Sequence, residues 1–403
     1  MIYLDYAATS YPKAPGVAEA MSRALTEAGG NPGRSGHALA VAAQAVVNDT
    51  RRRLATLLGA ADPQRIVFTA NTTAAINQAL FGLLRPGDRV ITSSTEHNAM
   101  VRPLAALAER GVLVEHIAAR ADGSIDLDEL ARALKAAPTR LVAMAHASNV
   151  TGTILPAQEA AQLAHEQGAL FLLDAAQTAG VLPLDLRLIA ADLLALPGHK
   201  GLLGPPGTGA LYVAPGVELL PLIYGGTGIR SEDERMPNEL PERLEAGTLN
   251  TVGLAGLGAA LSYLAEHGVA KVRAHEMELT ARLLAGLGEI PGLRVHGVAD
   301  PGRQVATVSI TLAGWEAVDL AAVLDSSFGI AARAGLHCAP AAHRSLGTFP
   351  GGTLRLSAGC FTSLDDIDQA VAALEQLAAP RRPPKFPQRW PLQNPPVEAK
   401  PMT

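Results

Sequence analysis

The sequence predicts an α/β fold with a large domain on a mainly parallel seven-stranded sheet and a smaller α+β domain. Between about Ile66 and Val213, short β-branched apolar runs alternate with alanine-rich helical stretches, which is typical of a parallel sheet covered by helices. After Thr251 this alternation gives way to a long helical region. The 403 residues exceed one ordinary domain, and 48% of them are hydrophobic, which is enough for a large packed core.

The large domain is expected to span residues 13–250. Helical patterns lie between most of its strands, so these strands are expected to run mainly parallel. The predicted strands are Arg65 to Thr69, Arg89 to Ser93, Val112 to Ile117, Leu141 to Ala145, Leu170 to Leu173, Leu193 to Leu196 and Gly209 to Val213.

The smaller domain is expected to include residues 251–379. A long helical region is followed by a strand at Val305 to Ile310, a helix near Ala317 to Leu324 and a strand at Thr353 to Ser357. Residues 380–403 contain many prolines and few periodic apolar positions. We therefore expect a Pro-rich tail without a core of its own.

Composition excludes several classes of function. No apolar run approaches the roughly 18 residues of a membrane span, and no basic, apolar leader opens the chain, so we expect a soluble, cytoplasmic protein without a membrane partner. The formal net charge of -5 offers no broad basic surface for nucleic acid. Cys338 and Cys360 are the two cysteines, too few for a disulfide framework, and one of them is a candidate nucleophile.

A lysine and an aspartate follow two of the expected core strands. Asp174 ends one strand, and Lys200 follows the next with His199 beside it. Strand ends are where α/β proteins keep ligand groups. A lysine can hold an aldehyde as a Schiff base, and an aspartate can keep a pyridine nitrogen protonated. The pair therefore predicts pyridoxal phosphate, although each residue alone is commonly a solvated charge or a turn former.

Other candidate cofactor ligands follow neighbouring strands. Thr72 and Thr73 open a helix, where hydroxyls and free N–H groups favour a phosphate, although an ordinary threonine cap is the alternative. His97 can stack on a planar ring, and Asn149 can donate to the cofactor or to the substrate. A surface histidine and a plain Asn/Gly turn are their alternatives.

One glycine-rich loop is not a phosphate-binding loop. Residues 204–209 have the glycine spacing of a nucleotide-binding loop, but Ala210 and Leu211 stand where lysine and Ser/Thr are required. A strand rather than a helix is expected to follow. The sequence therefore does not predict ATP binding.

A second group of reactive residues lies near the C-terminal end. The loop from Arg333 to Pro340 places Cys338 beside His337, as in an accessible, activated thiol. A buried structural cysteine is the alternative, which fits Cys360 better. Arg355, in a short strand, can bind a carboxylate through two contacts.

Zinc is a rival interpretation of the same loop. His337, Cys338 and His343 lack a second pair of ligands at zinc spacing, so no metal site is expected.

Taken together, these segments resemble the cysteine desulfurases of the class V aminotransferase group, nearest to the branch that includes selenocysteine lyases. The resemblance covers nearly all of the chain before residue 380 and implies a homodimeric pyridoxal-phosphate enzyme of fold type I, with residues 1–12 joining the smaller domain. The matching segments are Leu4 to Thr9, Asn31 to His37, Thr72–Thr73, Glu96 to Asn98, Ser148–Asn149, Asp174 to Gln177, Gly198 to Lys200, Glu245 to Thr248 and Arg333 to Ala339.

The resemblance also implies a role for each matching residue. Lys200 would carry the cofactor and remove the α-proton, Asp174 would pair with the pyridine nitrogen and His97 would stack on the ring. The other implied cofactor contacts are Gln177 and Asn149 at the ring substituents, Thr72, Thr73 and His199 at the phosphate, and Thr248 at the phosphate in the neighbouring subunit. The implied substrate-binding residues are Ala8, Asn149, Arg333 and Arg355.

The implied reaction converts L-cysteine to L-alanine with a persulfide on Cys338. The persulfide then passes to an acceptor, such as an iron–sulfur scaffold, a tRNA-thiolation protein or free thiols. Related reactions on the same scaffold are the alternatives, including selenocysteine lysis, aminotransfer and kynureninase-like cleavage. A selenocysteine-preferring enzyme should tolerate loss of Cys338. A silent sulfur-carrier partner is a further alternative, which the presence of Lys200, Asp174 and Cys338 disfavours.

Two positions depart from the family pattern. Pro197 stands where many relatives have a serine or threonine that can bond the phosphate, so an altered cofactor affinity is expected. Leu336 replaces one histidine of the pair common beside the cysteine, which predicts a changed rate or substrate choice.

Overall fold

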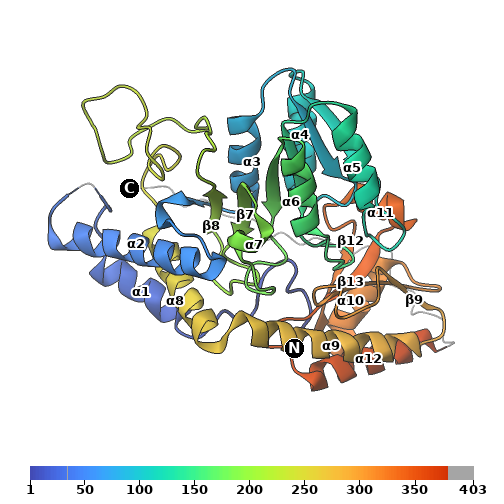
Figure 1. Cartoon of the computed structure of the whole chain (residues 1–403). Helices are drawn as coiled ribbons and strands as arrows, with labels where there is room; N and C mark the ends of the chain where they lie inside the picture. Colours follow the sequence, from blue (N-terminus) through green and yellow to red (C-terminus); the bar gives the residue numbers. More distant parts are fainter. Residues whose placement is uncertain (34, 380–403) are drawn as a thin grey trace, which may run out of the picture.

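The computed structural model describes residues 1–33 and 35–379, and the predicted Pro-rich tail at 380–403 lies outside the described residues. A seven-stranded sheet forms the centre of the molecule (Figure 1). The predicted α/β class, with its larger mainly parallel sheet and a smaller α+β unit, is confirmed.

The large sheet has the strand order β2-β8-β7-β6-β5-β3-β4. Only β8 runs antiparallel to its neighbours β7 and β2, so the remaining strands share one direction. Each observed strand lies within one residue of its predicted limits. The strands are β2 (Ile66–Thr69), β3 (Arg89–Ser93), β4 (Leu113–Ile117), β5 (Leu141–Ala145), β6 (Leu170–Asp174), β7 (Leu193–Pro197) and β8 (Gly209–Val213).

Helices cover both faces of this sheet, which explains why its strands are apolar throughout rather than alternating. Phe171 and Leu173 of β6 pack into one core, and Leu172 between them packs into the other. The first core is covered by α2 (Ala38–Leu58), α5 (Leu127–Ala136), α6 (Ala157–Glu166) and α8 (Thr251–His267), and the second by α3 (Thr72–Leu83) and α4 (Asn98–Ala108).

A smaller antiparallel sheet forms a third core beside α9 (Val269–Gly288) and α12 (Leu364–Ala378), which run alongside each other in Figure 1. Its strand order is β12-β13-β10-β9. The strands are β9 (Leu293–His296), β10 (Thr307–Leu312), β12 (Arg333–Gly335) and β13 (Thr353–Ser357), and α10 (Ala317–Phe328) packs on the same core.

The N-terminal segment joins this smaller unit. β1 (Ile2–Tyr3) pairs in parallel with β11 (Ile330–Ala331), and Leu4 is buried in the third core. The domain limits at residues 13–250 and 251–379 stay a prediction. α8, which begins at the predicted limit, packs on α1 (Val17–Glu27), on α2 and on the core of the large sheet.

The remaining elements are short: a 3₁₀ helix at Pro63–Arg65, α7 (Leu186–Ile189) and α11 (Pro340–Leu346). Within the described ranges, none of the helices has the length and apolar character needed to cross a membrane.

Candidate active site

A cavity of about 220 Å³ lies where the loops at the carboxyl ends of β2, β3, β5, β6 and β7 converge. It also receives residues from the N-terminal segment, β12 and β13. The cavity therefore brings together residues that are far apart in the sequence. The predicted residues that line it are Ala8, Thr72, Thr73, His97, Asn149, Asp174, Gln177, His199, Lys200, Arg333 and Arg355.

Asp174 is the last residue of β6, and Lys200 lies in the loop after the neighbouring strand β7; both line the cavity. Burial lowers the pKa of Lys200 to about 8, an effect that the negative charge of Asp174 partly opposes. Burial also raises the pKa of Asp174, against the Ala176 N–H, which donates to Oδ1 over 2.9 Å, and the charge of Lys200. The pair thus places a readily deprotonated amine beside a carboxylate.

The N-terminus of α3 leaves a buried hydroxyl without a partner. Thr72 Oγ1 makes no hydrogen bond with any described residue, although it is buried. Asn71 caps the helix by accepting a bond from the Ala74 N–H over 2.9 Å. A buried hydroxyl beside the free N–H groups of a first helical turn suits an anion. The site therefore fits the phosphate of pyridoxal phosphate.

His97 is fixed as a neutral ring on the cavity wall. Its Nδ1 accepts a hydrogen bond from the Ala99 N–H over 2.9 Å, which caps α4. Burial, and then the charges of Lys200 and Arg333, lower the pKa of His97 to about 4. Glu96, fully buried beside it, accepts bonds from the Ala145 N–H over 3.0 and 3.1 Å. Glu96 therefore joins the His97 loop to the end of β5.

The N-terminal segment holds the lysine loop. The carbonyl oxygen of His199 accepts hydrogen bonds from the Ser10 N–H over 2.9 Å and from Thr9 Oγ1 and Lys13 Nζ, each over 3.0 Å. Gln177 Nε2 donates to the Ala7 carbonyl over 3.1 Å. Sequence reasoning missed Lys13, whose pKa burial lowers to about 8, because no local pattern relates it to Lys200.

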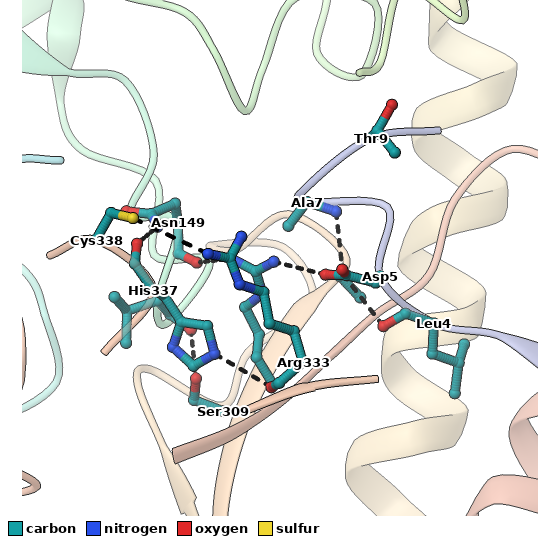
Figure 2. A network of polar contacts seen from close by, with 12 residues as sticks. Leu4, Asp5, Ala7, Thr9, Asn149, Ser309, Arg333, His337 and Cys338 are labelled. Carbon is teal, nitrogen blue, oxygen red and sulfur yellow. Dashed lines mark hydrogen bonds and ion pairs between the residues drawn. The ribbon is translucent and has the colours of Figure 1, made fainter. Parts of the chain in front are cut away.

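Two arginines make one end of the cavity cationic. Arg355 is 1% exposed, and its Nη1 donates to the Asn149 carbonyl over 2.9 Å. Its Nη2 donates to Asp5 Oδ1 over 2.7 Å. Arg333 extends from β12, with Nη2 lying 3.9 Å from Cys338 Sγ (Figure 2). Paired guanidinium groups of this kind suit a carboxylate.

Cys338 lies beside the cavity rather than in its lining, and its side chain is exposed. The loop expected from Arg333 to Pro340 is shorter than predicted, since its first three residues form β12. The turn that follows carries His337 and Cys338. Cys360, by contrast, is half-buried, and burial raises its pKa.

Comparisons with known proteins decide the family. The model of the class V aminotransferase family matches residues 2–370. The chain belongs to the class V aminotransferase family. Its members use pyridoxal phosphate, which agrees with the cofactor that the cavity fits.

Relatives of this class V chain are named cysteine desulfurases. A probable cysteine desulfurase of Methanothermobacter thermautotrophicus is 37% identical over 383 residues and covers 94% of each chain. One from Synechocystis is 35% identical and covers 93% of this chain and 90% of its own. A cysteine desulfurase from Thermococcus onnurineus superposes with a TM-score of 0.88 at 32% identity, and covers 94% of both chains.

A second solved structure that is similar to this chain is also a cysteine desulfurase. A cysteine desulfurase from Escherichia coli gives a TM-score of 0.83 at 32% identity, and covers 93% of this class V chain and 94% of its own. The family and these neighbours assign the chain to the fold type I group of pyridoxal-phosphate enzymes.

Some residues that the sequence analysis of this class V family member singled out lie outside the cavity lining. Thr248 lines a separate cavity with Leu222 and Ile223, so its predicted reach into a partner subunit stays a prediction. Pro197 ends β7 and pairs with Gly209 outside the cavity lining. Within residues 1–33 and 35–379, no group of three or more His, Cys, Asp or Glu side chains is placed to hold a metal ion.

Sequence reasoning did not assign a ligand role to two polar residues that line this class V site. Asn71 and His337 line the cavity. Asn71 directly precedes the predicted phosphate threonines, so a helix-cap pattern was a signal that could have found it.

Proposed function

We propose that this protein is a pyridoxal-phosphate-dependent cysteine desulfurase that converts L-cysteine to L-alanine and passes the sulfur through Cys338 to an acceptor thiol. Relatives of that name at 35–37% identity support the activity. One observation carries the proposal. A single cavity joins the Lys200–Asp174 pair to a cationic end, and an exposed cysteine lies beside that end.

The cofactor would be held from both ends of the cavity. Thr72, Thr73 and His199, which line the cavity, would hold the phosphate, and Asp174 would bond the pyridine nitrogen. His97 would cover one face of the ring, and Gln177 would contact the phenolic oxygen. When bound in this way, pyridoxal phosphate supplies an electron sink for the α-carbon of an amino acid.

The chain's own residues would bind and deprotonate the substrate. Arg355 and Arg333 would receive the carboxylate of L-cysteine, beside Ala8. Because burial lowers the pKa of Lys200 to about 8, a useful share of this amine is neutral near physiological pH. Its Nζ can therefore accept the α-proton once the substrate occupies the cavity.

Cys338 would then take the sulfur. Its thiolate attacks the substrate sulfur, the carbon–sulfur bond breaks, and the β-carbon is protonated. The balanced result is L-cysteine plus the Cys338 thiol giving L-alanine plus a Cys338 persulfide. The guanidinium of Arg333 lies 3.9 Å from Sγ, at the cationic end of the cavity.

The proposal includes a homodimer. Thr248 lies outside the cavity of its own chain, and Leu222 and Ile223 beside it are exposed apolar side chains. A partner subunit covering this face would bring Thr248 to the partner's cofactor phosphate. Sedimentation velocity at micromolar concentration tests this arrangement, and a monomer would contradict it.

A cytoplasmic location and delivery of sulfur to iron–sulfur cluster assembly also belong to the proposal. A reducing compartment keeps the Cys338 thiol free for turnover.

The first experiment records the visible absorption of the purified protein before and after L-cysteine, with alanine and sulfide measured in the same sample. A cofactor band that changes as alanine forms supports the proposed reaction. A cofactor band without alanine from L-cysteine, but with alanine from L-selenocysteine, would instead favour selenocysteine lysis. Absence of any band in protein supplied with pyridoxal phosphate would contradict the proposal.

A further inference from the structure

The turn that carries Cys338 has an unusual backbone. His337 and Cys338 adopt φ angles of 48° and 59°, both in the left-handed region. That region is costly for residues other than glycine, at about 1 kcal/mol or more each. Two such residues in succession persist only where surrounding contacts hold them in place.

Several contacts hold this turn. The Asn98 N–H donates to the Cys338 carbonyl over 2.7 Å, and the Ala339 N–H donates to the Leu336 carbonyl over 2.9 Å. The buried ring of His337 stacks on His343, with centroids 5.6 Å apart. These contacts leave the carbonyl of His337, at the centre of the strained pair, to be satisfied from another element.

Asn149 supplies that contact. Its Nδ2 donates to the His337 carbonyl over 2.7 Å, so the amide group is directed at the turn (Figure 2). Asn149 is buried, and its main-chain carbonyl accepts the 2.9 Å hydrogen bond from Arg355 Nη1. The main chain of Asn149 is therefore bonded to Arg355, and its side chain is bonded to the residue before Cys338.

We infer that Asn149 is a positioning residue for Cys338, which holds the strained turn and connects it to the carboxylate-binding arginine. This differs from the sequence-based expectation, in which the Asn149 amide binds the cofactor or the substrate carboxylate. The catalytic part of the inference rests on the proposed desulfurase function. The structural part, that the Asn149 amide keeps the turn closed, stands without it.

The test compares Asn149→Ala with Gln177→Ala as a matched control. Both substitutions remove a cavity-lining amide that donates to a main-chain carbonyl, but Gln177 binds Ala7 rather than the Cys338 turn. Hydrogen–deuterium exchange of peptides covering residues 336–342 is expected to become about fivefold faster in Asn149→Ala. Gln177→Ala should leave exchange in those peptides unchanged.

Two measurements on the cofactor-loaded enzyme separate positioning from substrate binding. In Asn149→Ala, single-turnover formation of the Cys338 persulfide should fall about 100-fold because the thiol is misplaced. The dissociation constant for L-alanine, which has the carboxylate but no sulfur, should change less than about threefold. If Asn149 instead binds the carboxylate, that constant rises about tenfold or more and the exchange rates stay at wild-type values.

The outcomes distinguish this inference from the proposed function. Unchanged exchange at residues 336–342 would overturn the inference, whatever the activity. Faster exchange in a protein whose wild type forms no alanine would retain the turn contact and reject the desulfurase function. If Asn149→Ala fails to fold, Asn149→Asp preserves the size of the side chain and removes its N–H donors, and the same criteria apply.

Discussion

Nη2 of Arg355 lies 2.7 Å from Oδ1 of Asp5, across a sequence separation of 350 residues. Arg355 is almost fully buried, whereas the Asp5 side chain is 22% exposed. The pair ties the N-terminal segment to β13 at the edge of the cavity. Asp5 therefore supplies the negative charge that allows a guanidinium to be buried where a substrate carboxylate is expected to bind.

Replacing Asp5 should destabilise the protein through Arg355. Asp5→Ala leaves a buried guanidinium without its counter-charge, which is expected to lower the free energy of unfolding by about 3 kcal/mol. Denaturant unfolding measures this change. Asp368→Ala is the matched control, because it removes the carboxylate of an exposed pair with Arg282 and should cost less than about 0.5 kcal/mol. If the free energy of unfolding falls equally in the two variants, Asp5 does not neutralise the buried Arg355.

Removing the unpartnered hydroxyl of Thr72 should weaken cofactor binding without weakening the apo protein. In Thr72→Val, a buried hydroxyl with no partner among the described residues becomes a methyl group, so the apo protein should unfold at the same denaturant concentration or a higher one. The dissociation constant for pyridoxal phosphate should rise about tenfold, since a hydrogen bond to a charged group is lost. Titration of the apo protein measures it.

Thr92→Val controls for the substitution itself. Thr92 Oγ1 is also buried and has no partner within residues 1–33 and 35–379, but Thr92 is in β3 and outside the cavity lining. The apo stability of this variant should likewise be preserved, and its cofactor affinity should match the wild type. If Thr72→Val binds pyridoxal phosphate as tightly as Thr92→Val does, the phosphate lies elsewhere.

Uptake of the cofactor by the apo protein should follow the ionisation of Lys200. Only the neutral amine attacks an aldehyde, and burial lowers the Lys200 pKa to about 8. The uptake rate is expected to rise about tenfold per pH unit below pH 8 and to level off above it. Stopped-flow absorbance between pH 6 and pH 10 measures this profile, and a rate still rising at pH 10 would contradict it.

The same pKa shift predicts a pH-dependent stability. The pKa of Lys200 falls from 10.5 to about 8 on folding, so the folded state binds fewer protons than the unfolded state between these values. The penalty for burying the charge is complete below pH 8 and is relieved as the pH rises toward 10.5. The apo wild type should therefore gain stability relative to Lys200→Met across that window. Comparing the two proteins cancels the contribution of Lys13 to the pH dependence of stability, because the pKa of Lys13 is lowered similarly in both.

Loss of the Cys338 thiol should separate the chemistry of sulfur transfer from cofactor binding. Cys338→Ser is expected to retain the absorption spectrum of the bound cofactor and to form alanine from L-cysteine at least about 100-fold more slowly. Cys360→Ser should stay within about twofold of the wild type, because that half-buried thiol has a raised pKa. Alanine formation at the wild-type rate in Cys338→Ser would reject the persulfide route.

Local patterns were sufficient to predict the large sheet and much of the cavity. Asp174 and Thr72 stand directly at a strand end and a helix start, so a few neighbouring residues identify their positions. The contact of Asp5 with Arg355 has no such signal, since it depends on how distant segments fold together. β12 was also missed, because three residues are too few to show strand periodicity.

The pairing of β1 with β11 sets an order of events on the ribosome. Ile2 and Leu4 are made well before the segments after α8 that build the core around them. At typical rates of synthesis, roughly 20 to 60 s pass before their partner strand is made. Ala7 and Ala8, which wall the cavity, are held by the same segment. The cavity is therefore complete only after β11, β12 and β13 have been made.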